Sequence, residues 1–584
     1  MNKTIKYMSN RGIKNKNSNK KTKKKKIQKK IMNRPNIKDD AFTYFNYSWI
    51  NNTKIPKTKT KTNLYSILQE NIDRYLIKMI ESFEKSKKEE EINCWNLYYS
   101  YLKRDNSLIK HHIKNEYNHL CSILGCNDIM KLYIFFTFKN ISLPFVWSVD
   151  QDSRNVSHYE NHLYDNGLTL IDKDYYILNE HNDKLNEYKK YIKNMFDYIF
   201  GKNHKFDINS IIDVEKEFAK YTPDEWERQN SDKNYNKVSS DELTEMGFNW
   251  KTYSHEIGFK KTPNFIILNN KRYFERMFNF INKNWNTDKM RSYWIFKLIK
   301  SFSGLENKLK EMSFNFFDYY LHDQKSQISD KNAAMKIVTE SMNTYISNKF
   351  LKENCDKKNR DYIERLSQEI LVTFKNRINK NNWLSNKTKD YAIKKINNTR
   401  IFVGHKDRFL KDSNIQYTKE DIYLNLIGNI NCEIKDMIYL YSIKYDKFSW
   451  NRYETGNVYD VNAFYNPLNN EIILPCGILR YPFVQTKYNF EYVLAFLGTT
   501  IAHELIHGFD DDGSKYDMNG NYVTWWSKKD KEKYLQKQNS IIKLYNKILK
   551  KDGYDIDSKL SLGENLADNG GLSICEDLLT EKIK

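Results

Sequence analysis

Two histidines and a glutamate lie close together near the carboxyl end of the chain. His503 and His507 are four residues apart, with Glu504 beside the first, in the sequence TTIAHELIHGF. The preceding residues 493–497 are apolar and lack proline, which predicts a buried helix that continues through the motif. Residues four apart on a helix project from the same face. Two imidazoles and a carboxylate could serve a catalytic zinc, although this spacing also occurs by chance.

A second motif supplies the carboxylates that such a site still needs. A catalytic zinc usually has three protein ligands and leaves its fourth position to water. Glu564 and Asp568 stand four residues apart in LGENLADNGGL, and therefore on one face of a helix. One carboxylate can bind the metal while the other accepts the free N–H of a ligating histidine. The alternative, that both cap or solvate a surface helix, is disfavoured once the two motifs are considered together.

These motifs carry a resemblance to a known family. HELIHGFDDDG, the Trp525-Trp526 pair and LGENLADNGGL together resemble the neprilysin and endothelin-converting-enzyme family of zinc metallopeptidases. VNAFYNP at 461–467 and ILPCGIL at 473–479 are similar to that family's substrate-binding strand and the segment after it. The resemblance extends from about Asn36 to the end of the chain. It implies a mainly α (α+β) fold, with a large helical N-terminal lobe and a thermolysin-like zinc catalytic lobe that has a small sheet.

The resemblance also implies a role for each residue of the site. One Zn²⁺ per chain would be held by His503, His507 and Glu564. Glu504 would act as general base, and Asp568 would orient a histidine ligand. Two of the family's substrate-binding positions, which hold the peptide main chain, correspond to Asn462 and Ala463. Three others, which shape the pocket for the residue after the scissile bond, correspond to Ile478, Phe483 and Thr500.

The resemblance implies a zinc-dependent endopeptidase that hydrolyses oligopeptides on the amino side of hydrophobic residues. In the family the chain continues past the second motif and supplies a histidine that stabilises the oxyanion, whereas this sequence stops at Lys584. Losing one oxyanion donor costs about 10²- to 10³-fold in turnover. We therefore expect a C-terminally truncated catalytic domain, and the alternative function is a catalytically impaired or inactive pseudo-peptidase that binds peptides.

The remaining elements must position these residues. Residues 35–397 have helical periodicity with few Gly or Pro, which predicts a helical N-terminal domain. Its clearest predicted helices are 64–83, 185–200, 209–221, 273–284, 289–300 and 361–377. Residues 398–457 are interpreted as an inter-lobe connection and 458–584 as the catalytic domain. In the latter, 461–465 and 471–474 read as two strands joined by a turn at 466–470. An edge strand beside the zinc helix could bind a peptide by strand addition.

Charge and composition separate the amino-terminal tail from the rest of the chain. The 584 residues carry a net charge of +22. Residues 1–34 contain 14 Lys or Arg and no acid, so the remainder carries +8, which is 22 minus 14. We expect this basic tail to be disordered. It could be a nuclear-targeting signal or contact nucleic acid or another polyanion, but compositional bias toward Lys and Asn is the favoured explanation.

The cysteines and the absence of long apolar runs bear on the compartment. The 7 cysteines are widely spaced, and no CxxC occurs. A disulfide framework is therefore not expected, which favours a reducing compartment. No signal peptide or membrane span is evident, so the predicted location is cytoplasmic. Cys476 stands where the family has a small apolar residue, and simple packing is favoured over a chemical role. Oligomeric state and natural substrate do not follow from these patterns.

Overall fold

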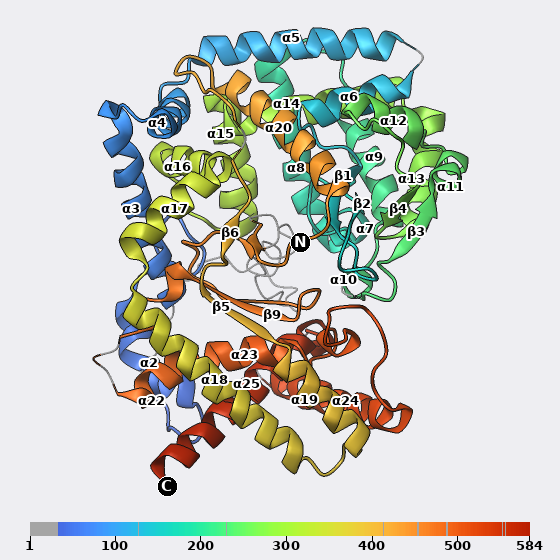
Figure 1. Cartoon of the computed structure of the whole chain (residues 1–584). Helices are drawn as coiled ribbons and strands as arrows, with labels where there is room; N and C mark the ends of the chain where they lie inside the picture. The colour runs from blue at the N-terminus through green and yellow to red at the C-terminus, as the bar shows by residue number, and fades with distance from the viewer. Residues whose placement is uncertain are drawn as a thin grey trace.

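The chain is built mainly of α-helices, with three small sheets among the residues that the structure describes (Figure 1). This confirms the predicted mainly α (α+β) class. The structure is a computed structural model that describes residues 33–584 except 127, 229, 413, 452–454, 486, 488, 552 and 555. The predicted basic tail lies outside the described residues apart from its last two positions.

Most helices precede residue 400. They are α2 (Ala41–Asn52), α3 (Leu64–Glu81), α4 (Glu89–Leu102), α5 (Asn106–Gly125), α6 (Ile129–Phe138), α7 (Asp174–Ile177), α8 (Asn182–Phe200), α9 (Ile208–Tyr221), α10 (Glu225–Arg228), α11 (Ser240–Glu245), α12 (Trp250–Ile257), α13 (Lys271–Asn284), α14 (Asp288–Ser301), α15 (Asn307–Ser313), α16 (Asp330–Ser341), α17 (Asn343–Asn354), α18 (Lys357–Lys380) and α19 (Asn386–Asn397). The six helices predicted most clearly from periodicity correspond to α3, α8, α9, α13, α14 and α18, with shifts of a few residues at their ends.

Local sequence explains where these helices begin. The Asn63 side chain accepts a hydrogen bond from the backbone N–H of Ser66, and the Ser66 hydroxyl oxygen accepts one from the backbone N–H of Asn63, which forms a capping box at the start of α3. At the start of α13 the Asn270 side chain accepts a hydrogen bond from the backbone N–H of Tyr273. Along α13 the buried residues recur at helical spacing and face the core: Tyr273, Phe274, Met277, Phe278 and Ile281.

A four-stranded sheet within the helical region was not predicted. Its strands are β1 (Phe145–Gln151), β2 (Tyr159–Asp165), β3 (Asn236–Ser239) and β4 (Phe265–Leu268), in the order β1-β2-β4-β3. β1 alternates buried and half-buried residues along its whole length, which is the period of a strand. β3 and β4 have four residues each, so neither is long enough to show a clear period in the sequence.

A three-stranded sheet lies beside the candidate site. It contains β5 (Arg400–Gly404), β9 (Glu471–Pro475) and β8 (Phe464–Asn466), in the order β5-β9-β8. β5 pairs with β9 in parallel, and β8 pairs with β9 in antiparallel register, Phe464 opposite Ile473. The strand predicted at 471–474 is therefore observed. The strand predicted at 461–465 begins three residues late, because the backbone N–H of Val461 donates to the Gln69 side chain at 2.8 Å instead of to a strand.

The last third of the chain completes the site. It contains β6 (Arg408–Phe409), paired with β7 (Ser449–Trp450), and the helices α20 (Ile422–Ser442), α22 (Phe490–Val493), α23 (Thr499–His507), α24 (Lys528–Lys551) and α25 (Leu562–Ile583). α18 lies beside α23 and α25 (Figure 1), and Thr388 of α19 donates to Asp530 of α24 at 2.7 Å. Lys395 of α19 donates from Nζ to the backbone carbonyls of Gly508, Gly513 and Tyr516 at 2.7, 2.8 and 2.8 Å. The predicted domain boundaries at 397 and 457 stay predictions.

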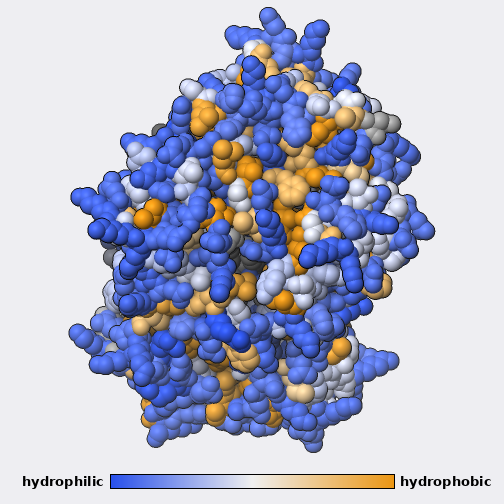
Figure 2. All heavy atoms as spheres, turned by 45° about the horizontal axis from the view of Figure 1, so that its top comes forward, coloured by the Kyte–Doolittle hydropathy of each residue, from blue (hydrophilic) through white to orange (hydrophobic). Residues whose placement is uncertain are grey.

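The surface is predominantly hydrophilic. Figure 2 shows polar residues over most of one face, with hydrophobic residues gathered in a strip near its middle. This agrees with a composition in which 29% of residues are charged. Among the described residues, none of the helices combines the length and the apolar character that crossing a bilayer would require.

Candidate metal centre

The helix α23 presents the first motif. A π-helical turn, η6 (Leu494–Gly498), leads directly into α23, which ends at His507. Such π turns inside helices are frequent at functional sites because they shift the register of the side chains that follow. Ile501, Ala502 and Leu505 are buried, which fixes the rotation of the helix. The opposite face therefore presents both histidines toward α25.

The helix α25 approaches α23 closely because two glycines face it. A Cβ placed on Gly571 would lie 2.8 Å from the backbone nitrogen of His503. A Cβ placed on Gly570 would lie 2.8 Å from Cγ1 of Ile506. Since glycine has no Cβ, the two backbones can come together and bring Glu564 within reach of both histidines.

The two glycines should differ in their tolerance of alanine. In Gly571→Ala the new methyl group meets backbone atoms, so the helices must separate, and we expect the free energy of unfolding to fall by about 1–3 kcal/mol. In Gly570→Ala the methyl group meets the Ile506 side chain, which can rotate, so the loss should be smaller. Both substitutions gain similarly in helix propensity. Urea denaturation of both variants measures the difference, and equal stabilities would show that Gly571 is not the limiting contact.

The predicted ligand atoms converge. The Nε2 atoms of His503 and His507 are 3.0 Å apart. The Glu564 carboxylate lies 3.4 Å from Nε2 of His503 and 3.9 Å from Nε2 of His507. One ligand atom from each of these three residues falls within 4.8 Å of the other two. The structure thus brings His503, His507 and Glu564 together from two helices that are far apart in sequence.

The outer nitrogens of both rings are held by carboxylates. His503 Nδ1 lies 3.0 Å from Asp568, and His507 Nδ1 lies 2.8 Å from Asp510. A ring that donates its Nδ1 proton to a carboxylate keeps a lone pair on Nε2. Two such lone pairs at 3.0 Å repel unless a proton or a metal cation lies between them. The donor set of two imidazoles and one carboxylate therefore fits a zinc ion.

Electrostatics at the centre favours positive charge. Burial acts to lower the pKa of His503, but its bonds to Asp568 and Glu564 outweigh this effect and raise that pKa to about 10. For His507, burial is likewise outweighed, mainly by Asp510 and Glu504, and the pKa rises to about 9. The same contacts hold the pKa of Glu564 below its usual value, first through the bond to His503. This excess of carboxylate charge stabilises a bound cation.

Glu504 differs from the other carboxylates of the centre. Its side chain is buried, and burial raises its pKa against the opposing effect of the two histidines. Its carboxylate also accepts a hydrogen bond from the backbone of Tyr465 in β8. A buried carboxyl group with a raised pKa, next to an edge strand, is suited to accept and return a proton.

Asp510 is a candidate site residue that the sequence analysis missed, since its carboxylate contacts Nδ1 of His507. Asp510 forms a turn, because its Oδ1 accepts from the backbone N–H groups of Asp512 and Gly513 at 2.9 and 2.7 Å. The other oxygen contacts His507. The signal was an acidic residue three positions after His507, a predicted ligand, just beyond the end of the helix.

Removing the charge of Asp510 should weaken metal binding. In Asp510→Asn the side chain keeps its shape but contributes less to the basicity of His507, and loss of such an outer contact typically costs about 10- to 100-fold in metal affinity. Competition with a chromophoric chelator measures the zinc affinity. Asp511→Asn is the matched control, since it makes the same chemical change one residue away. Equal affinities for the two variants would contradict a specific role for Asp510.

The predicted pocket residues lie in three segments. Ile478, in the 3₁₀ turn η5 (Cys476–Ile478), is fully buried, and Phe483 is nearly so. Thr500 of α23 is half-buried. Tyr65 of α3, which the sequence analysis missed, contacts both Phe483 and Thr500. Its ring packs edge-on against the Phe483 ring with the ring centroids 4.5 Å apart, and its hydroxyl oxygen lies 3.1 Å from the Thr500 hydroxyl oxygen. No local sequence signal marks Tyr65, because it lies 435 positions before Thr500 in the chain.

The two predicted main-chain-binding residues lie at the approach to β8. Asn462 is exposed and Ala463 is buried. Both precede β8, which is the outermost strand of the sheet β5-β9-β8 among the described residues. The structure thus places them beside the sheet edge rather than within a strand.

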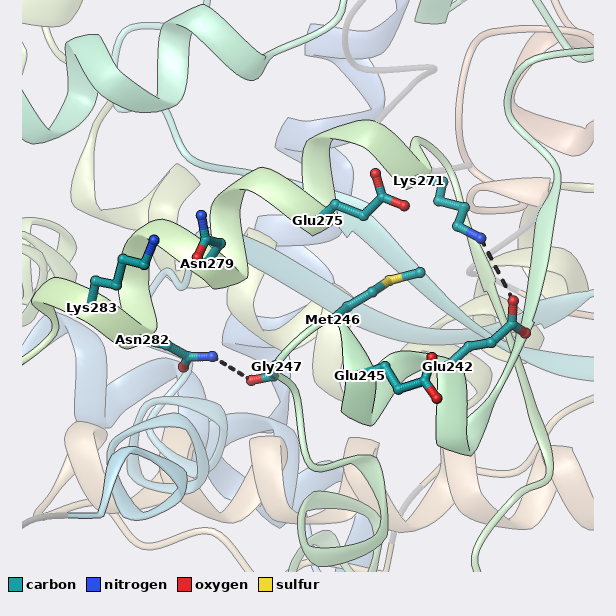
Figure 3. A pocket seen from close by; sticks show the side chains of 9 residues that line it. All are labelled: Glu242, Glu245, Met246, Gly247, Lys271, Glu275, Asn279, Asn282 and Lys283. Carbon is teal, nitrogen blue, oxygen red and sulfur yellow. Dashed lines mark hydrogen bonds and ion pairs between the residues drawn. The ribbon is translucent and has the colours of Figure 1, made fainter.

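A separate surface groove lies between α11 and α13, which contribute none of the predicted site residues (Figure 3). Its volume is about 650 Å³. Across it, Lys271 pairs with Glu242 at 3.6 Å, and Asn282 donates to the carbonyl of Gly247 at 2.8 Å. None of the residues that line this groove belongs to the metal centre.

Comparison with sequence families gives two matches. Residues 37–406 match the amino-terminal model of "Peptidase family M13", and residues 462–580 match its catalytic model. The chain is 24% identical over 556 residues to a neutral endopeptidase of Lactococcus lactis subsp. cremoris, covering 92% of this chain and 86% of the relative. It is 25% identical over 585 residues to neprilysin-3 of Drosophila melanogaster, covering 91% of this chain and 72% of that relative.

Solved structures share the fold. The zinc metalloprotease Zmp1 of Mycobacterium tuberculosis, solved in complex with an inhibitor, superposes with a TM-score of 0.87 at 21% identity, covering 95% of this chain and 86% of that one. PepO of Lactobacillus rhamnosis superposes with a TM-score of 0.84 at 19% identity, covering 93% of this chain and 87% of PepO. The helical architecture with small sheets is therefore the architecture of these proteins.

Proposed function

The chain belongs to peptidase family M13 and is a metallopeptidase, and from this premise we propose that it is a zinc-dependent endopeptidase that cleaves oligopeptides on the amino side of hydrophobic residues. The convergence of two imidazole Nε2 atoms and the Glu564 carboxylate, with each Nδ1 on its own carboxylate, is the observation that carries the proposal.

We assign the metal ligands as His503, His507 and Glu564, with Asp568 and Asp510 orienting the two rings. When bound, zinc would supply Lewis acidity that polarises the scissile carbonyl and makes a water molecule more acidic. The two outer carboxylates keep the ring protons on Nδ1 and so leave both Nε2 atoms available as ligands. This division of roles agrees with the distances of 3.0 and 2.8 Å to the outer carboxylates.

Glu504 moves the proton in this proposal. Its carboxylate takes a proton from water as the water attacks the peptide carbonyl, and then gives that proton to the departing amine. A buried group with a raised pKa holds the proton long enough to return it, whereas an exposed glutamate would lose it to solvent. The hydrogen bond from the Tyr465 backbone fixes the carboxylate beside β8.

The peptide would bind at the free edge of β8. Main-chain hydrogen bonds of an added strand are independent of sequence, so side-chain pockets must supply specificity. Asn462 and Ala463 would hold the peptide backbone. Ile478 and Phe483 would make the pocket after the scissile bond apolar, and the contact of Tyr65 with Thr500 would add one polar edge to it.

Cleavage of a defined peptide mixture tests this function. The full chain is incubated with zinc and a mixture of unstructured peptides, and mass spectrometry maps the new ends. We expect internal cuts that are enriched before Leu, Ile, Phe and related residues, and loss of all cuts with a chelator. Zinc and peptide binding without any cut would instead support the pseudo-peptidase, and cuts confined to chain ends would contradict an endopeptidase.

A further inference from the structure

Two cysteines lie together outside the residues assigned to peptide hydrolysis. Cys355 joins the end of α17 to the start of α18, and Cys476 is the first residue of η5. Gly404 pairs with Pro475 in the sheet, next to Cys476, and a Cβ placed on Gly404 would lie 3.0 Å from Sγ of Cys355. Sγ of Cys476 also lies 3.5 Å from the carbonyl of Asn354. Asn354 directly precedes Cys355 in the chain, and Pro475, the sheet partner of Gly404, directly precedes Cys476, so the two thiols lie in the same small region.

The surroundings of this pair are positively charged. The Arg480 guanidinium reaches the same Asn354 carbonyl at 3.5 Å, and the Arg360 side chain contacts Gly404 beside Cys355. The Nε atoms of both arginines are buried and have no hydrogen-bond partner in the described part of the chain. Buried donors without an acceptor cost free energy. An anionic sulfur at Cys355 would relieve that cost.

The two thiols are not equivalent. The bond from the Cys476 thiol lowers the pKa of Cys355 against the effect of burial, and the charges of Arg360 and Arg480 lower it further. The pKa of Cys476 is raised, first by Cys355 and then by burial. Cys355 is partly exposed, whereas Cys476 is buried. A small reagent can therefore reach the more acidic sulfur first, and the second sulfur lies directly behind it.

We propose that Cys355 and Cys476 form a peroxide-reactive dithiol that closes reversibly to a disulfide, with Cys355 as the attacking thiol and Cys476 as the resolving thiol. Simple packing, which the sequence alone favoured for Cys476, explains neither the partner thiol nor the two arginines. The proposal uses none of the residues assigned to hydrolysis, so it stands or falls independently of the peptidase activity.

The chemistry balances with hydrogen peroxide as the oxidant. The Cys355 thiolate attacks one peroxide oxygen, the O–O bond breaks, and the departing hydroxide takes a proton to become water, which leaves a sulfenic acid on Cys355. The Cys476 sulfur then attacks Sγ of Cys355 while its proton goes to the leaving hydroxyl, so the S–O bond breaks and a second water departs. Two thiols are oxidised and one peroxide is reduced to two waters. An external dithiol reverses the bond by exchange.

The bond would join two parts of the chain that are distant in sequence. It would tie the α17–α18 junction to the turn that follows β9, two residues before Ile478. Closing so long a loop restricts the unfolded chain, so the oxidised protein should melt at a higher temperature than the reduced one. A thiol that is oxidised without forming this bond would not raise the melting temperature.

Peptide mapping of the full chain tests the proposal. Reduced, folded protein is freed of reductant, treated with hydrogen peroxide and digested without reduction. We expect a linked peptide that contains Cys355 and Cys476 and has lost two hydrogens, that disappears after dithiothreitol treatment, and that accompanies a rise of several degrees in Tm. In Cys476→Ala, dimedone should trap a sulfenic acid at Cys355. In Cys355→Ser, Cys476 should stay reduced.

Cys121→Ser is the matched control, because Cys121 is an exposed thiol on α5 and its loss should leave the linked peptide unchanged. The proposal is overturned if folded protein yields no linked peptide, or if the link forms only in urea. It is also overturned if dimedone labels Cys121 as fast as Cys355 in Cys476→Ala. Circular dichroism of each variant verifies that the chain is folded when these outcomes are read.

Discussion

Glu504→Gln should lower kcat for peptide hydrolysis by about 10²- to 10⁴-fold while the protein still binds one zinc ion. Glutamine has nearly the same shape as glutamate but cannot take a proton from water. Because Glu504 is not among the three residues whose ligand atoms converge, its substitution should leave the metal in place. Turnover of a fluorogenic peptide, together with metal analysis of the same sample, measures both quantities.

The control for this variant is Glu581→Gln, which makes the same chemical change at an exposed position near the end of α25. It should leave kcat unchanged. Full activity of Glu504→Gln with zinc still bound would show that another group accepts the proton. Loss of zinc from Glu504→Gln would instead mean that its carboxylate belongs to the ligand set.

The metal centre could be predicted because its information is local. His503 and His507 occupy one turn of one helix, and Glu564 and Asp568 one turn of another, so helical spacing alone places each pair on a common face. The helices with strong periodicity, such as α13, were predicted for the same reason. What spacing could not give is the meeting of the two helices, which depends on Gly571 leaving room for the backbone of α23 and on Gly570 leaving room for the Ile506 side chain.

Features that depend on distant contacts escaped the sequence analysis. Tyr65 reaches Thr500 across 435 positions, and no pattern near Tyr65 signals that contact. The late start of β8 has the same origin, since Gln69 of α3 takes the backbone N–H of Val461. β3 and β4 are short strands held by their neighbours in the sheet, so their residues alone do not specify them.

His507→Ala should abolish stoichiometric zinc binding and reduce hydrolysis to background. The substitution removes one of three ligand atoms and leaves Asp510 without its ring partner, so the loss should exceed the roughly 10- to 100-fold expected for an outer contact such as Asp510→Asn. Equilibrium dialysis against zinc, followed by metal analysis, measures the stoichiometry. The same sample, assayed with a fluorogenic peptide at saturating zinc, shows whether hydrolysis follows the metal.

A matched control separates the site from general effects of losing a histidine. His111→Ala removes a histidine from α5. In the described residues, the one hydrogen-bond partner of this ring is the nearby Asn115 side chain. The His111→Ala protein should therefore keep both zinc and activity. Folded His507→Ala protein that holds one zinc ion as tightly as the parent would refute the ligand assignment. Because Glu504 stays in place in this variant, lost activity together with lost zinc would show that the proton-accepting carboxylate cannot sustain hydrolysis without the metal.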